Sequence, residues 1–177
     1  MRREVFAHLA FWFSFFVLIS IFRDYLSLTY WPFWLGGLVG TILPDIDHLI
    51  YVFFLNPHEL TSQRVSFLFK KKEFLRVITL LYETRNERKS LIFHTFLFQI
   101  IFFILTFFIV SSSSSFLVRG IVLAFSLHLV VDQLADILEV KNLSNWGELF
   151  SSELDFSKSN LYISVSFLLV FIMGFFM

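Results

Sequence analysis

Acidic side chains lie inside stretches of this sequence that are otherwise apolar enough to face lipid. They are Asp45, Asp47, Asp132 and Asp136. An ionised aspartate at the centre of a bilayer costs about 2.5–3.5 kcal/mol on insertion scales, so all of them together would cost about 10 kcal/mol, comparable to the stability of a whole domain. No lysine or arginine lies among them. We therefore expect no buried cationic side chain here, and protons or a bound metal cation to neutralise the charge.

Two histidines stand next to these aspartates at spacings that suit chelation. His128 and Asp132 are four residues apart, so they share one face of a helix. Asp45 and His48 are three residues apart and do the same. Imidazole and carboxylate groups together favour a metal cation over protons.

Pro44 interrupts the apolar segment beside the first two aspartates. Because proline has no backbone N–H, we expect the helix to kink and the carbonyl of Gly40 to lose its helical partner. Gly36 and Gly40 form a small-xxx-small pair, whose ordinary role is close packing of a neighbouring helix.

The elements that carry these residues must be membrane helices. The chain is 57% hydrophobic, has 27 phenylalanines among its 177 residues, and has a mean hydropathy of +0.76, well above the values of soluble domains. Net charge is zero and cysteine is absent, which excludes disulfides and thiolate chemistry. We expect a single integral membrane domain over 1–177 with no internal repeat.

Apolar runs near the ~20 residues that a helix needs to cross a bilayer predict an all-α, polytopic transmembrane bundle of four to five spans. The spans are expected at about 5–22, 31–55, 91–110, 116–140 and 160–177. The fifth is short and ends at the last residue. We expect the first to be retained rather than cleaved as a signal peptide, because no small-residue cleavage site follows it.

The basic residues predict the orientation, since they prefer the cytoplasmic side of short loops. With the N-terminus inside, only Arg23 and Arg119 of the 14 basic residues lie outside. Residues 56–90 then form a cytoplasmic loop, in which Glu73 to Glu83 is predicted to be a helix on the membrane face. Trp146, in a second cytoplasmic loop, is expected to anchor at the interface.

This topology brings polar side chains from four spans to one depth, in the inner half of the bilayer. The predicted metal ligands are Asp45, His48, His94, His128 and Asp132, with Asp47 as a further ligand or catalytic base and His8 as a peripheral ligand. A single intramembrane histidine is more often a packing residue, a reading that stays open for His8 and His94. Asp136 and Glu139 are expected to reach the inner interface as solvated residues.

The residues Leu43-Pro44-Asp45-Ile46-Asp47-His48 resemble the LPDIDH signature of the YdjM-like family of membrane-bound metal-dependent hydrolases, also described as LexA-binding inner-membrane proteins. Other similarities follow in the family's order and extend to about Trp146. His8 resembles the histidine near the start of its first span, and His94 the second histidine of its HRGxTHS element. His128 with Asp132 resembles its HxxxD. The resemblance implies a helical metal site and a hydrolase in a prokaryotic plasma membrane.

The chain departs from the family in the HRGxTHS element. Lys89 and Ser90 stand where the family has its first histidine and its arginine, and Leu91 and Phe93 replace the glycine and threonine. Either that histidine is not an essential ligand or this chain has lost a catalytic part. Arg88 and Lys89 could supply positive charge at this place.

The sequence therefore predicts a membrane hydrolase that uses a divalent cation to activate water. Zinc fits the mixed ligand set best, and manganese or iron would also fit. We expect an amphipathic substrate, such as a phospholipid or lipid phosphate, that reaches the site from the inner leaflet, and membrane lipids but no nucleic acid as partners. A soluble protein partner is compatible with this function. The alternative is a transporter or regulatory membrane protein that binds metal or relays protons without hydrolysis.

Overall fold

Helices form all the regular structure in the part of the chain that the computed structural model describes, namely residues 2–88, 91–139, 141, 143, 146–147 and 156–177, and no strand occurs there. The all-α bundle predicted from the sequence is thus confirmed. The helices are α1 (Arg2–Arg23), α2 (Trp31–Ile42), α3 (Ile46–Ile50), α4 (Leu60–Lys70), α5 (Phe74–Glu83), α6 (Phe96–Ser112), α7 (Phe116–Glu139) and α8 (Phe156–Phe175). Short 3₁₀ turns lie at Leu28–Tyr30, Leu43–Asp45 and Arg85–Glu87, and a π-helical turn at Tyr51–Leu55.

Within the described residues, three helical stretches are long and apolar enough to cross a membrane: Val5–Arg23, Leu28–Leu55 and Phe116–Glu139. Phe96–Ser112 and Ser159–Phe175 are apolar but shorter. The third predicted span was placed at 91–110, whereas α6 begins at Phe96. The residues just before it are not helical, and the backbone N–H groups of Ile92 and Phe93 donate to the side chain of Asp47.

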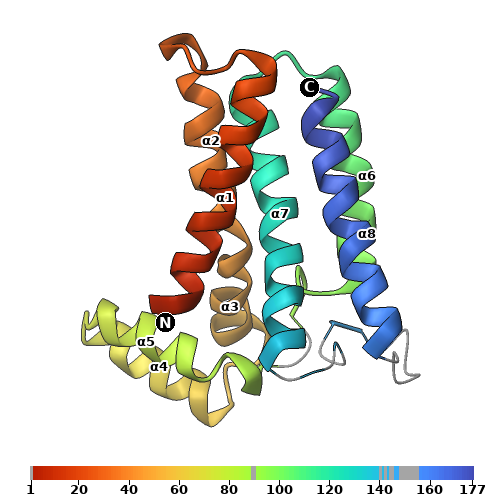
Figure 1. Ribbon diagram of the computed structural model, residues 1–177. Coiled ribbons are helices and arrows are strands. Elements are labelled where there is room, and N and C mark those ends of the chain that lie inside the picture. Colours follow the sequence, from red (N-terminus) through yellow and green to blue (C-terminus); the bar gives the residue numbers. More distant parts are fainter. Residues whose placement is uncertain (1, 89–90, 140, 142, 144–145, 148–155) are drawn as a thin grey trace.

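Helix α7 is the centre of the bundle and packs against α1, α2, α6 and α8 (Figure 1). Helices α4 and α5 lie across one end, next to the start of α1, and the last residue lies at the opposite end (Figure 1). The helix predicted for 73–83 is confirmed as α5, and α4 precedes it in a loop for which no second helix was predicted. The turn between them places Lys72 at φ 59°, a left-handed conformation that ends α4.

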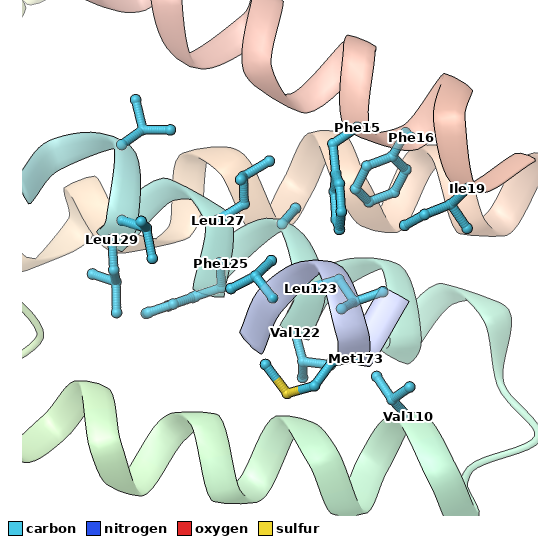
Figure 2. Close-up of a cluster of buried hydrophobic side chains, with 14 of the residues drawn as sticks. Phe15, Phe16, Ile19, Val110, Val122, Leu123, Phe125, Leu127, Leu129 and Met173 are labelled. Carbon is cyan, nitrogen blue, oxygen red and sulfur yellow. The ribbon is translucent and has the colours of Figure 1, made fainter. Parts of the chain in front are cut away.

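The half of the bundle away from α4 and α5, here called the apolar end, is filled with hydrophobic side chains (Figure 2). Phe15, Phe16 and Ile19 of α1 face Leu123 of α7 and are at most 4% exposed. The ring of Phe16 stacks on Phe33 with 4.4 Å between centroids. Apolar packing of this density leaves little room for water.

Glycines allow α2 and α7 to meet backbone to backbone. A Cβ added to Gly36 would fall on the carbonyl of Leu117, and one added to Gly40 would fall on the carbonyl of Ile121. From the other side, a Cβ at Gly120 would fall on the carbonyl of Phe33. The close-packing role predicted for Gly36 and Gly40 is confirmed, and it fixes α2, and the polar residues after it, against α7.

Candidate metal centre

Asp132 on α7 lies at the centre of a cluster of imidazoles near the α4–α5 end. Its Oδ1 is 3.3 Å from His8 Nε2 of α1. Its Oδ2 is 3.0 Å from His94 Nε2, just before α6, and 3.1 Å from His128 Nε2, one turn earlier on α7. We call these four residues the histidine cluster. The predicted convergence of polar side chains from several helices is present, and His8, predicted to be peripheral, belongs to the cluster.

The backbone of α2 fixes which nitrogen of His128 carries a proton. His128 Nδ1 is 2.7 Å from the carbonyl oxygen of Thr41. A carbonyl can only accept, so Nδ1 donates, and in the neutral imidazole Nε2 keeps a lone pair. That nitrogen is buried, has no hydrogen-bond donor, and faces Asp132. Two electron-rich atoms in such contact call for a positive charge between them, a second proton or a metal ion.

The break in α2 explains why this carbonyl is available. The helix ends at Ile42 and continues as a 3₁₀ turn that contains Pro44. The sequence predicted a break here and a freed carbonyl at Gly40. The carbonyl that His128 uses is that of the next residue, Thr41.

The spacing of the cluster suits a small cation. The ligand atoms of His8, His128 and Asp132 all lie within 4.8 Å of one another. Tetrahedral zinc with nitrogen and oxygen ligands at ~2.0–2.2 Å sets its ligands about 3.3–3.5 Å apart. His8 Nε2 lies 3.3 Å from Asp132 Oδ1, and His128 Nε2 lies 3.1 Å from the other oxygen, Oδ2. These three residues could therefore hold a metal ion with little movement.

Asp47 orients His94. Its Oδ2 is 3.1 Å from His94 Nδ1, on the side of the ring opposite Asp132. The same carboxylate accepts hydrogen bonds from the backbone N–H groups of Ile92 and Phe93, at 3.1 and 2.6 Å, and is fully buried. A carboxylate behind an imidazole is the usual outer partner of a metal-binding histidine. Asp47 as a direct ligand or base stays a prediction, but its contacts are those of a positioning residue.

Asp45 and His48 lie at the edge of the cluster. Asp45 Oδ1 is 3.8 Å from His128 Nε2, and its side chain is 59% exposed. The ring of His48 stacks on that of His94 with 5.4 Å between centroids. Both residues line the cavity described below. Their role as metal ligands stays a prediction.

Arginine side chains enter the site from the turn after α5, and the expectation that no buried cation neutralises the aspartates is therefore wrong. Arg85 Nη2 lies 3.2 Å from Asp132 Oδ1 and 3.0 Å from Asp136 Oδ1. Arg88, 3% exposed, donates from Nε to His48 Nδ1 at 3.1 Å. Burial lowers the pKa of Arg88 to about 10, so it is still protonated at neutral pH.

The balance of charge still leaves room for a bound cation. Among the described side chains around the cluster, the guanidinium groups of Arg85 and Arg88 stand against three buried aspartates, Asp47, Asp132 and Asp136, while Asp45 is 59% exposed. With neutral imidazoles, one buried negative charge remains. Burying it unpaired would be costly, so a metal ion or an imidazolium proton must balance it.

Trp146 belongs to the site rather than to the membrane interface. It is 1% exposed, and its Nε1 donates to Asp136 Oδ2 at 2.7 Å. Its ring lies edge-on to His94 with 5.5 Å between centroids. The predicted interfacial anchor is therefore wrong, and so is the solvated Asp136, which is 8% exposed and held by Arg85 and Trp146.

A cavity of about 410 Å³ opens onto the cluster. Its polar lining includes His8, His128, Asp132 and Arg85. The rest is largely hydrophobic and comes from α1, α2, α3 and the apolar faces of α4 and α5: Val5, Leu9, Ile42, Ile46, Leu49, Phe69, Phe74, Val77, Ile78 and Leu81. The cavity thus joins a charged floor to apolar walls.

Sequence reasoning missed the roles of Arg85, Trp146 and the Thr41 carbonyl. The positive charge expected near Arg88 is present, and the only signal for it was the departure from the family motif. Lys89, which was also expected to supply positive charge there, lies outside the described residues. His58 is exposed and lies away from the cluster ligands.

No family model, curated protein or solved structure matches the chain. In the part of the chain that the structure describes, the fold and the site define a helical protein with three helices long enough to cross a membrane and a histidine–aspartate group able to hold a metal ion. The proposal about function below is therefore based on the geometry of that group.

Proposed function

We propose that this chain is a membrane-embedded, metal-dependent hydrolase of the YdjM-like family. A divalent cation would be held by His8, His128 and Asp132, with His94 as fourth ligand. The observation that carries the proposal is the hydrogen bond from His128 Nδ1 to the Thr41 carbonyl, because it leaves the Nε2 lone pair aimed at Asp132. We propose zinc, since a set of imidazoles with one carboxylate suits it; manganese or iron would fit the same donors.

A bound divalent cation supplies Lewis acidity and lowers the pKa of a coordinated water toward ~7. The residues of the chain do the rest. Asp47 holds the His94 ring in place from behind, and Asp132 supplies the negative charge among the proposed ligands. Asp45 is exposed to the cavity close to His128 and is placed to accept a proton. Arg85 lies beside Asp132 on the cavity wall and would bind an anionic oxygen of the substrate.

The shape of the cavity favours an amphipathic substrate. A charged floor beneath hydrophobic walls accommodates a polar head group with part of an acyl chain. Exposed apolar residues of α5, such as Leu75 at 82% and Ile78 at 56%, would place the mouth of the cavity at a membrane surface. A lipid phosphate or phospholipid is the proposed substrate class. We place the α4–α5 end and the N-terminus on the cytoplasmic side of a prokaryotic inner membrane, because basic residues are more frequent on that side.

The rival function is a transporter or regulatory protein that binds metal or relays protons without hydrolysis. A relay needs titratable groups through the whole bilayer. No titratable residue lies between His8 and Arg23 on α1, or between Arg119 and His128 on α7. The apolar end is closed by packed phenylalanines, which favours a one-sided pocket.

Elemental analysis of the purified protein tests the metal site. We expect about one zinc per chain in the wild type and in His58→Gln, an exposed-histidine control, and none in His128→Gln. A folded wild-type protein that binds no divalent metal would refute the proposal.

Hydrolysis is tested separately by incubating zinc-loaded protein with lipid phosphates, phospholipids and lipid esters. Release of phosphate, alcohol or fatty acid by the wild type but not by His128→Gln supports a hydrolase. Bound zinc without turnover of any of these classes would favour the rival function.

A further inference from the structure

Arg88 fixes the tautomer of His48. The Arg88 Nε–H lies 3.1 Å from His48 Nδ1. A guanidinium group has donors only, so His48 Nδ1 must accept, and it carries no proton. The proton of the neutral imidazole is therefore on Nε2. This arrangement is the reverse of that in His128, where a carbonyl forces the proton onto Nδ1.

The opposite tautomers imply opposite chemistry. The bare Nε2 of His128 is a ligand atom, whereas His48 has its lone pair occupied by Arg88 and offers an N–H at its other nitrogen. A protonated nitrogen cannot coordinate a cation. His48 lines the cavity and stacks on His94, beside the cluster but outside the compact ligand group.

Arg88 is itself held firmly, so the tautomer does not depend on a mobile side chain. Its Nη1 donates to Thr84 Oγ1 at 2.9 Å, and its Nη2 donates to the carbonyl of Leu81. Both acceptors lie at the end of α5, the helix that covers the cavity. Arg88 thus connects His48 on α3 to that helix.

We propose that His48 is a hydrogen-bond donor to an anionic oxygen of the substrate head group and not a metal ligand, and that Arg88 is the positioning residue that keeps it a donor. The role in turnover rests on the proposed function. The tautomer and the absence of a metal bond do not rest on it. The anionic oxygen can be that of a phosphate or of a carboxylate, which the probes below distinguish.

Nitrogen NMR of the full chain in lipid nanodiscs, with ¹⁵N-labelled histidine, tests the tautomer. We expect His48 to show a protonated Nε2 and an unprotonated Nδ1, with its signals assigned by their loss in His48→Gln. Arg88→Met should give a mixture of both tautomers, and Arg88→Lys, which keeps a cationic donor, should restore the wild-type pattern. An unprotonated Nε2 on His48 in the wild type would overturn the proposal.

Zinc and probe binding test the division of roles. His48→Phe keeps a ring against His94 but has no N–H, so we expect it to retain the wild-type zinc content. It should bind dioctanoyl phosphatidic acid about tenfold more weakly, the effect of one hydrogen bond to a charged group. Octanoate serves as the carboxylate probe, and His48→Gln, which keeps a donor, should recover part of the loss. Loss of zinc from folded His48→Phe, or unchanged binding of both probes, would contradict the proposal.

These outcomes separate the inference from the proposed function. A wild type that binds no metal, with His48 in the expected tautomer and the expected loss of probe binding, would refute the hydrolase and leave the donor role standing. Stoichiometric zinc with His48 unprotonated at Nε2 would refute the donor role of His48 and leave the proposed metal site standing.

Discussion

The two ends of the bundle are built on opposite principles, although the same helices run through both. At the apolar end, helices approach through glycines and aromatic rings, and the contacts are close and without charge. At the α4–α5 end, helices are joined through Asp132, Asp47 and the imidazoles between them. We therefore expect the first end to supply stability and the second end to hold the candidate metal site. Substitutions at the apolar end should therefore prevent folding, whereas substitutions at the α4–α5 end should reduce metal binding in a folded protein.

The largest effect is expected from Gly120→Leu at the apolar end. Overpacking costs about 1–3 kcal/mol where side chains can yield, but here the added atoms would meet the backbone of Phe33. We expect no folded protein, measured by circular dichroism and thermal unfolding in detergent. Val118→Leu, on an exposed position of the same helix, should unfold like the wild type. A folded Gly120→Leu with wild-type stability would show that the helices do not meet as described.

Asp132→Asn should give the opposite result, a folded protein without metal. The change removes the charge shared by His8, His94 and His128. We expect zinc affinity to fall by more than the 10–100-fold typical of residues that only support a ligand, measured by competition with a chelating dye. Asp24→Asn, exposed at the other end of α1, is the control. Wild-type zinc affinity in Asp132→Asn would place the metal elsewhere.

Asp47→Asn should produce an intermediate loss. Asparagine retains one oxygen acceptor for the backbone of Ile92 and Phe93 but loses the negative charge behind His94. We expect zinc affinity to fall by about 10–100-fold. A complete loss of zinc from a folded variant would instead make Asp47 a ligand, as the sequence first predicted.

The smallest effect on metal binding is expected from Asp45→Asn. The Asp45 side chain is 59% exposed and 3.8 Å from His128, and exposed ion pairs contribute about 0–1 kcal/mol. Zinc affinity should therefore change by no more than about fivefold. Turnover should still fall by about 100-fold or more if Asp45 accepts the proton. A large loss of zinc with folding intact would move Asp45 into the ligand set.

The sequence was informative where local spacing decides the structure. The four-residue interval between His128 and Asp132 on one helix, the break at Pro44 and the glycines of α2 all acted as expected. These features need only helix geometry and the chemistry of single residues.

Contacts between residues that are far apart in the sequence could not be predicted in this way. Arg85 donates to Asp136, which is 51 positions away in the sequence. The polar residues around Arg85 predict only a loop. Trp146 has the composition of an interfacial anchor, yet it is buried on His94. Helix α4 was missed because its hydrophobic residues are mixed with polar ones and mark no continuous face.

The late start of α6 has a consequence for the surrounding lipid. The helix has 17 residues, or about 25 Å of length, against the ~30 Å hydrocarbon thickness of an average bilayer. A membrane span this short is accommodated by local thinning of the bilayer, by snorkelling of flanking residues or by association with another chain. Where thinning accommodates α6, lipid head groups would sit deeper beside it than on the face formed by α1 and α2.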